Sequence, residues 1–232
     1  MVDRILVINP NSSRSCTQGI DVALAGFRAP GLPRIEVTQL ESGPPAIVTW
    51  RDWFGVAEPL CQLVEREEAA AYVIACVSDP GVDAIRTITR PPVFGPLRSA
   101  VAAALARADR FGIIAFGDLS LPRQRRSLQA MGVESRLLGH IPLNLPMEVL
   151  TDPAAPRAAL VAAGRRIAEM GAEAVILGCA GMAFHRAAVE QACGIPVIEP
   201  CQAAVALALQ AVVAARPAQS EARARAQAQA AE

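Results

Sequence analysis

Two cysteines, Cys76 and Cys179, combine a reactive side chain with matching positions at the ends of two apolar runs. Residues 72–75 lead into Cys76, and residues 174–178 lead into Cys179. A free thiol has a pKa of about 8.5, so near neutral pH it can take a proton from carbon and also return one. A single base returns its proton to the face from which it came. Two thiols on opposite sides of one carbon would instead invert that carbon.

The sequence that follows each cysteine repeats. PPVFGPLRSAVAAAL (91–105) follows Cys76, and IPVIEPCQAAVALAL (195–209) follows Cys179. Residues of the same type fall at equivalent positions in the two segments: Val93 with Val197, Pro96 with Pro200, Ala100 with Ala204 and Leu105 with Leu209. Both thiols therefore lie at the same place in two copies of one structural unit, and they face each other if the copies do.

The residues directly after each cysteine suit a ligand-binding turn. Val77 and Ser78 follow Cys76, and Ala180 and Gly181 follow Cys179. Small residues at a strand-to-helix turn let backbone N–H groups approach a ligand, and the N-terminus of the next helix favours negative charge. We expect this field to lower the thiol pKa towards neutrality and to stabilise an enolate formed on a bound carbonyl.

A polar segment, Asn9 to Ser13, follows the first apolar run of the chain. Helix capping alone would explain a polar side chain here, because a helix is predicted to begin near Ser15. If the segment lies at the same sheet edge as the cysteines, then Asn9, Ser12 and Ser13 are candidates to hold the polar groups of a small substrate.

The elements that must position these residues alternate between strands and helices. Apolar runs at residues 4–8 and 110–115 open two similar halves. The alternation predicts βαβ units with parallel sheets, and unbroken apolar runs are typical of strands covered by helices on both faces. We predict an α/β fold of two pseudo-symmetric Rossmann-like lobes, each with a mostly parallel sheet flanked by helices. Lobe 1 is expected at residues 1–98 plus about 203–216, lobe 2 at 99–202, and a low-complexity tail, helical or disordered, at 217–232.

Composition limits the classes of function. Hydrophobic residues make up 53% of the 232 residues, which is enough for a large core, and 22 basic residues balance 22 acidic ones. Aromatic residues are only 4%, and no basic stripe accompanies them, which argues against a nucleic-acid partner. Neither a signal peptide nor a membrane-spanning run is evident. We expect a cytoplasmic protein whose partner is a small-molecule substrate, with no membrane partner and with Ala-rich helices that suit a homo-oligomer.

The remaining cysteines predict packing more than chemistry. No two form a CxxC pair, and a cytosolic chain of this size needs no disulfide. Only His140 and His185 are present, so we expect no His-rich metal site. Buried small hydrophobic residues are the expected role of the other thiols: Cys16, Cys61, Cys193 and Cys201.

Three motifs in order, VINPNSS (7–13), CVSDPG (76–81) and LGCAGM (177–182) with the later IPVIEP (195–200), resemble the aspartate/glutamate/hydantoin racemase superfamily. The hydantoin and allantoin racemase branch is the most similar, over about residues 4–215. The resemblance implies a cofactor-independent enzyme with its active site in the cleft between two lobes. It implies Cys76 and Cys179 as the acid–base pair acting on a 5-substituted hydantoin, allantoin or related carbonyl compound. Asn9, Ser12 or Ser13 and the backbone amides around Ser78, Ala180 and Gly181 would hold the substrate.

Two segments depart from the branch pattern and keep alternatives open. GPLRS (95–99) stands where the branch has GIAEA, and AFGDLS (115–120) replaces a Thr-Thr-Leu segment, keeping only Ser120. If these positions line the pocket, Phe116 makes it more apolar and Arg98 adds a cation. An aspartate/glutamate racemase or another isomerase or decarboxylase of the superfamily is the alternative within enzymes. A two-lobe binding protein with packed cysteines, or a redox pair within disulfide reach, is the alternative of another kind.

Overall fold

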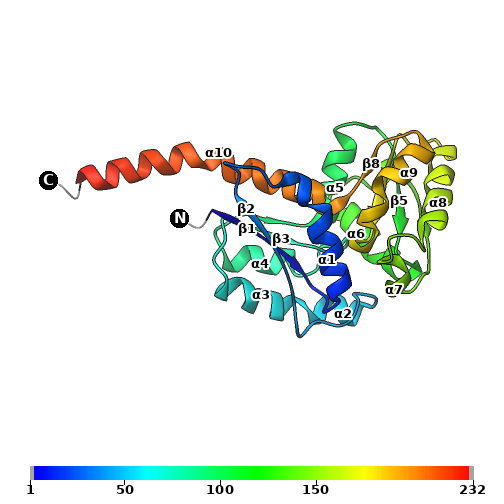
Figure 1. The fold of residues 1–232 in the computed structure, drawn as a ribbon, viewed down its shortest axis with the longest axis horizontal. Coiled ribbons are helices and arrows are strands. Elements are labelled where there is room, and N and C mark those ends of the chain that lie inside the picture. Colours follow the sequence, from blue (N-terminus) through cyan, green and yellow to red (C-terminus); the bar gives the residue numbers. More distant parts are fainter. Residues whose placement is uncertain (1–2, 230–232) are drawn as a thin grey trace.

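The computed structural model describes the backbone of residues 3–229 and the side chains of residues 3–216 (Figure 1). Eight strands form two parallel sheets. Sheet A contains β1 (Arg4–Asn9), β2 (Arg34–Gln39), β3 (Ala71–Ile74) and β4 (Val93–Phe94); sheet B contains β5 (Phe111–Ala115), β6 (Leu137–Pro142), β7 (Ala174–Gly178) and β8 (Val197–Ile198). The strand orders, β2-β1-β3-β4 and β6-β5-β7-β8, are equivalent, which confirms the predicted α/β fold of two related lobes.

Helices cover both sheets. In chain order the α-helices are α1 (Arg14–Ala23), α2 (Trp50–Gly55), α3 (Ala57–Arg66), α4 (Val82–Ile88), α5 (Pro96–Leu105), α6 (Leu121–Ala130), α7 (Met147–Leu150), α8 (Arg157–Glu169), α9 (Arg186–Cys193) and α10 (Pro200–Gln229). Short 3-10 helices are η1 (Ala25–Phe27), η2 (Asp118–Ser120), η3 (Glu134–Arg136) and η4 (Ala180–His185). No helix within residues 3–229 is both long and apolar enough to span a bilayer.

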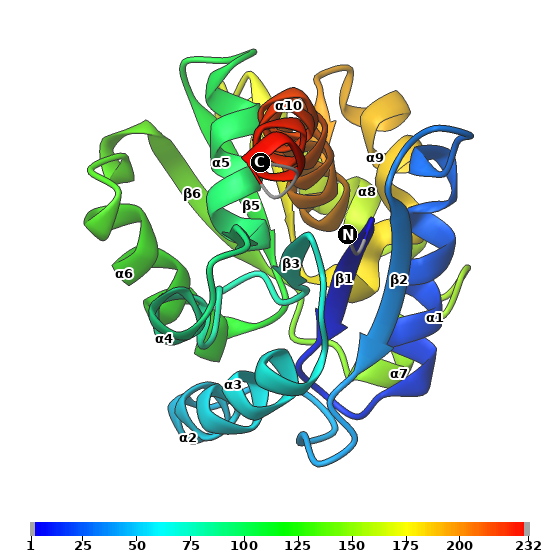
Figure 2. The same ribbon diagram turned by 90° about the vertical axis from the view of Figure 1, so that its left-hand side faces the viewer.

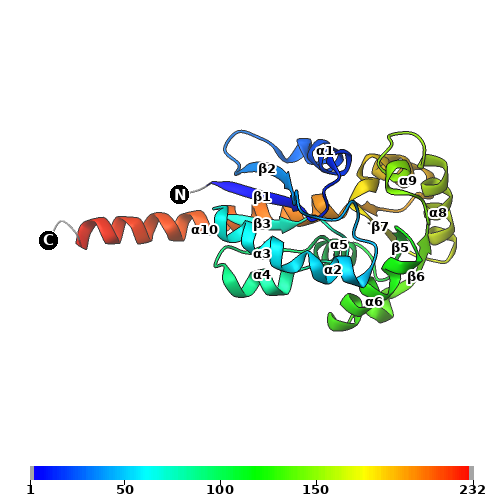
Figure 3. The ribbon, with the colours of Figure 1, turned by 90° about the horizontal axis from the view of Figure 1, so that it is seen from below.

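Alternate residues of each central strand pack on opposite faces of its sheet. In β1, Ile5 and Val7 pack with α1 and α10, whereas Leu6 and Ile8 pack with α3 and α4. Figure 2 shows these two pairs of helices on opposite sides of sheet A. In sheet B, α5 and α6 cover one face and α8 and α9 the other (Figure 3). Because both faces are buried, the strands are apolar throughout, as the unbroken apolar runs predict.

The last helix crosses back over the first lobe. Although α10 follows sheet B in the chain, it contacts β1, β3 and β4 of sheet A and packs along α5. Figure 1 shows its C-terminal part extending beyond both sheets. The chain therefore joins its two lobes through α5 and α10, which lie side by side and begin at the equivalent prolines Pro96 and Pro200.

Buried carboxylates cap the N-termini of these two helices, but they come from different positions of the repeated unit. Asp79 accepts hydrogen bonds from two backbone N–H groups in the first turn of α5, at 2.8 and 3.1 Å. Glu199 does the same for α10, at 3.1 and 2.6 Å. The repeat places Gly95 where Glu199 stands, and a Cβ on Gly95 would lie 2.3 Å from the Asp79 carboxyl carbon. The N-terminus of α5 therefore has room for one capping carboxylate and not for two.

Candidate active site

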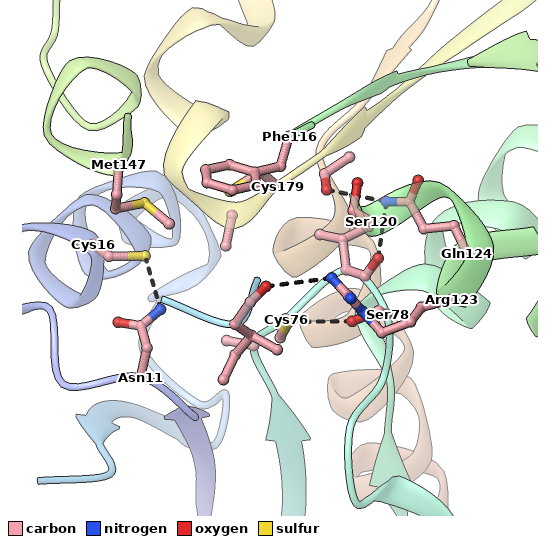
Figure 4. Close-up of a pocket in the computed structure, with 15 residues that line it drawn as sticks. Asn11, Cys16, Cys76, Ser78, Phe116, Ser120, Arg123, Gln124, Met147 and Cys179 are labelled. Atoms are coloured by element: carbon pink, nitrogen blue, oxygen red, sulfur yellow. Dashed lines mark hydrogen bonds between the residues drawn. The ribbon is translucent and has the colours of Figure 1, made fainter. Parts of the chain in front are cut away.

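A cavity lies where the carboxyl ends of the two sheets meet, and residues from both lobes line it (Figure 4). About 40 Å³ of it is open to the centres of water molecules, so its occupant must be a small molecule. Parallel sheets bind ligands at this edge. The lining comprises Asn11, Cys16, Ile47, Ala75, Cys76, Val77, Ser78, Phe116, Ser120, Arg123, Gln124, Met147, Gly178, Cys179 and Ala180.

Cys76 lies just beyond β3, at the start of a tight turn. Its Sγ is 3.5 Å from the Ser78 hydroxyl, and the backbone N–H of Asp79 donates to its carbonyl oxygen. Asp79 adopts a left-handed conformation (φ 51°), which turns the chain back so that its carboxylate reaches α5. Burial raises the pKa of the Cys76 thiol, while the Ser78 hydrogen bond and the positive charge of Arg123 oppose that rise.

Cys179 occupies the equivalent place after β7. Gly178 precedes it, where a Cβ would come within 2.5 Å of the Ile114 carbonyl oxygen, so the strand end packs closely against β5. A 3-10 helix, η4, follows in place of the α-helix expected there, and the backbone N–H of Gly181 interacts with the thiol. Burial raises the pKa of Cys179 strongly, and the neighbouring Cys16 thiol adds to that rise.

The expected lowering of the thiol pKa is therefore wrong for both cysteines. The α-helix that follows Cys76 begins only at Val82, and Cys179 is followed by the 3-10 helix η4, so neither thiol adjoins the N-terminus of an α-helix. Desolvation consequently outweighs the local hydrogen bonds, and burial is the largest cause of both shifts.

The structure divides the predicted binding residues into two groups. Five of them lie in the cavity lining with the cysteines: Val77, Ser78, Phe116, Ser120 and Ala180. Gly181 lies behind Cys179, where an added Cβ would be 3.6 Å from Sγ.

Asn9, Ser12 and Ser13 lie outside the lining, and the polar side chains of Asn9 and Ser13 order the loop itself. The Asn9 amide donates to Asn11 Oδ1 at 2.9 Å and to Thr17 Oγ1 at 3.0 Å. Ser13 Oγ caps α1 by accepting the N–H of Cys16. Ser12 and Ser13 instead line an outer groove, which Phe116 separates from the thiol cavity. Of this segment only Asn11 reaches the cavity.

Arg98, proposed as a cation for a substrate carboxylate, is placed elsewhere. Its guanidinium pairs with Asp79 at 3.8 Å and with the exposed Asp83 at 3.3 Å, outside the lining. Arg98 is therefore paired with protein carboxylates and does not support an amino-acid substrate. Trp53 also supports the site without lining it, because its indole N–H donates to the Ser78 carbonyl oxygen at 2.9 Å.

Other lining residues were missed in the sequence, and the most informative lie on α6. Gln124 is fully buried, and its amide N–H₂ donates to Val77 O at 3.1 Å and to Gly178 O at 3.2 Å. These carbonyls flank the two catalytic candidates, so one side chain ties both cysteine loops together. Arg123 beside it is also buried and faces Cys76 (Figure 4).

Cys16 was predicted to be a packed core residue, but it also reaches the cavity. It is buried, as expected, but it also lines the cavity, with Asn11 Nδ2 at 4.0 Å from its Sγ. Burial raises its pKa to about 11. All six cysteines lie in the described part of the chain and are free thiols, so the structure gives no support to a disulfide pair. Within that part, no group of three or more His, Cys, Asp or Glu residues could hold a metal ion.

Comparison with known proteins agrees across sequence and structure. The model of the Asp/Glu/hydantoin racemase family matches residues 5–208. A hydantoin racemase from Pseudomonas sp. (strain NS671) is 36% identical over 217 residues, covering 88% of this chain and 84% of its own. A hydantoin racemase from Paenarthrobacter aurescens is 35% identical, with 88% and 89% coverage.

Solved structures of two allantoin racemases have the same fold. The protein from Klebsiella pneumoniae superimposes with a TM-score of 0.83 at 30% identity, covering 91% of this chain and 87% of its own. The protein from Pseudomonas fluorescens also gives a TM-score of 0.83, at 25% identity and 90% coverage of each chain. The likeness extends over both lobes.

Proposed function

The chain belongs to the Asp/Glu/hydantoin racemase family, and from this premise we propose that it is a cofactor-independent racemase of a small cyclic ureide. Its substrate would be a 5-substituted hydantoin, allantoin or a related carbonyl compound. Cys76 and Cys179 would act as the acid–base pair on the carbon next to the carbonyl.

One observation carries this proposal: both thiols line the same buried cavity from equivalent positions in two related lobes. β3 and β7 occupy the same place in the two sheets, and each ends at a cysteine loop. A small molecule between the loops would have one thiol on either side.

The chemistry follows from that placement. One cysteine, as thiolate, takes the proton from the carbon, and the electron pair moves onto the carbonyl oxygen as an enolate. The other cysteine, as thiol, protonates the opposite face as the enolate collapses. The two sulfurs have then exchanged their protonation states. Burial raises the pKa of both thiols, and a thiolate with a raised pKa is a stronger base towards a carbon acid.

Polar groups in the lining can orient a ureide ring. Ser120 Oγ donates to the Gly117 carbonyl oxygen at 2.7 Å, so its lone pairs can accept a ring N–H. Phe116 and Met147 provide an apolar wall on the side of the outer groove. We expect the ring to lie between the thiols and its 5-substituent to point towards Phe116.

The experiment is proton NMR in deuterated water with single enantiomers of 5-substituted hydantoins, allantoin, aspartate and glutamate. We expect loss of the Cα–H signal above the spontaneous rate, together with decay of optical activity, for a ureide. Cys76→Ala and Cys179→Ala should each lower racemisation at least about 100-fold, the usual contribution of one acid–base group. Cys61→Ala, a matched change outside the cavity on α3, should leave the rate unchanged.

The possible results separate the alternatives. Exchange only with aspartate or glutamate would replace the ureide with an amino-acid substrate. Binding of a ureide without exchange at its carbon would favour a non-catalytic binding protein. Full activity in either single cavity variant would refute the two-thiol mechanism.

A further inference from the structure

Arg123 is a buried cation with only neutral partners. Its side chain extends from α6 to the cavity, and the residue is 3% exposed. Nη1 donates to the carbonyl oxygens of Val48 at 2.8 Å and Leu119 at 2.9 Å, and Nη2 donates to that of Ile47 at 3.4 Å. Among residues 3–216 its buried Nε has no hydrogen-bond partner, and the guanidinium forms no ion pair. A buried charge without a counter-charge is unfavourable, so an anion is expected beside it.

The two thiols of the cavity are unequal with respect to this cation. The charge of Arg123 stabilises the anionic form of Cys76, and in return an anionic Cys76 stabilises the guanidinium. Asp52, half-buried on α2, also acts on Arg123, but it caps its own helix and makes no ion pair with Arg123 in the described structure. Figure 4 shows the guanidinium reaching across the lining on the Cys76 side.

The other groups that face the two thiols do not reverse this inequality. Cys76 faces the Ser78 hydroxyl and the Asp79 carboxylate of its own loop, and that carboxylate is already held by the N-terminus of α5. Cys179 faces Glu199, a carboxylate that the N-terminus of α10 holds in the same way, so the two carboxylates do not distinguish the thiols. No cation of the described residues is a main influence on Cys179, whereas Arg123 acts on Cys76. Neutral thiols complete the surroundings of both: Cys16 on α1, Cys201 on α10 and each other.

We propose that Arg123 is a positioning residue that makes Cys76, and not Cys179, the sulfur that carries the negative charge when the pair shares one proton. The inference deepens the proposed function, on which it rests for the role of the pair. In a racemase, the unliganded enzyme would then be ready for the enantiomer whose Cα–H faces Cys76. After turnover of that enantiomer the negative charge would lie on Cys179. A proton would then have to move from Cys76 to Cys179 before the enzyme could convert another molecule of the same enantiomer.

The test is the pH profile of alkylation by iodoacetamide, a small neutral reagent, followed for each cysteine by peptide mass spectrometry. Rates are normalised to their alkaline maxima over about pH 6.5–10.5, which spans the range where thiols ionise. In the unaltered protein we expect Cys76 to reach half its maximal rate at a lower pH than Cys179. Arg123→Gln should shift only the Cys76 profile, to a higher pH by about one pH unit. At a fixed pH below the midpoint, this corresponds to an alkylation of Cys76 that is about tenfold slower.

Two further variants make the result specific. Arg123→Lys keeps the charge and should retain most of the Cys76 profile. Arg126 lies on α6 with Arg123 but is exposed, with its guanidinium 5.8 Å from the ring of Trp50 on α2. Arg126→Gln should therefore change neither cysteine profile. Circular dichroism and thermal unfolding of each variant establish that it is folded.

Several outcomes overturn the proposal. In the unaltered protein, ionisation of Cys179 before Cys76 does so without any variant. An unchanged Cys76 profile in Arg123→Gln also overturns it, because the charge of Arg123 would then have no effect on Cys76. An equal shift of both cysteine profiles does so as well, because it would indicate a general change of the cavity and not a charge that acts on one thiol. Alkylation needs no substrate. A protein that shows the expected profiles but no exchange with any compound would therefore refute the racemase and leave the Arg123 assignment standing.

Discussion

Gln124 offers the sharpest test of how the cavity is held together. Its side chain is the single link between Val77 O in the first lobe and Gly178 O in the second, and both carbonyls adjoin the candidate catalytic cysteines. Gln124→Leu keeps a similar volume but removes both donors. The substitution leaves two buried carbonyl oxygens without this partner.

The expected cost follows from the hydrogen bonds. Leaving a buried acceptor unsatisfied costs about 1–3 kcal/mol, so two lost bonds cost about 2–6 kcal/mol. Gln124 Oε1 itself has no partner within the described residues, and its removal recovers about 1–3 kcal/mol. The free energy of unfolding should therefore fall by about 2 kcal/mol, which corresponds to roughly 4–8 °C in Tm for a chain of this size. Gln124→Glu should be worse, because it adds a buried carboxylate facing two carbonyl oxygens.

Urea unfolding followed by far-UV circular dichroism gives the free energies, and Gln129→Leu provides the matched control. Gln129 lies on the same helix but is exposed, so its replacement should change stability by less than about 0.5 kcal/mol. We also expect Gln124→Leu to slow any racemisation, because the hydrogen bonds that fix the separation of the two cysteine loops are lost. The reasoning fails if Gln124→Leu is as stable as the control, or if Gln124→Glu is the more stable of the two.

Three further substitutions test the supporting structure. Gly95→Ala should lower stability by about 1–3 kcal/mol in thermal melts, because its Cβ would displace the Asp79 cap; an equal loss when Asp79→Ala is already present would contradict this reason. Burial raises the pKa of Glu199 to about 7 from an ordinary value near 4.5, so its ionisation weakens the folded state as pH rises through that window. Glu199→Gln should remove a decline of up to about 3 kcal/mol between roughly pH 4.5 and 7 in urea midpoints, and an unchanged decline would refute the assignment. Trp53→Phe should cost about 1–2 kcal/mol in urea unfolding through the lost hydrogen bond to Ser78 O, and a neutral effect would place that indole in a purely apolar role.

The sequence predicted the architecture because the signals were repeated and local. Apolar runs of strand length, a duplicated segment and a cysteine at each equivalent strand end are sufficient to indicate two lobes and to bring Cys76 and Cys179 to one edge. The same reasoning could not predict burial. It gave the wrong direction for the thiol pKa, since desolvation depends on what the opposite lobe places over each cysteine.

The α6 residues were missed for a different reason. LPRQRRSLQA has the composition of a solvated helix face, with three arginines in four residues. Gln124 nevertheless lies at the spacing of Leu121 and Leu128, a polar residue in an otherwise apolar stripe, and that is the signal that could have found it. Arg98 shows the reverse error, because the buried Asp79 and the exposed Asp83, both distant from it in sequence, pair with its guanidinium.

The unequal origin of the two capping carboxylates restricts how the halves of this protein can be recombined. Asp79 lies three residues after Cys76, whereas Met182 stands three residues after Cys179 and the carboxylate comes from Glu199 instead. A chimera that joins the first cysteine loop to the second lobe's helix entry would bring two carboxylates to one helix N-terminus. The reciprocal chimera would bring none. Crossovers in a domain-shuffled library should therefore survive only where a cysteine loop and the helix entry that follows it in the chain are inherited together.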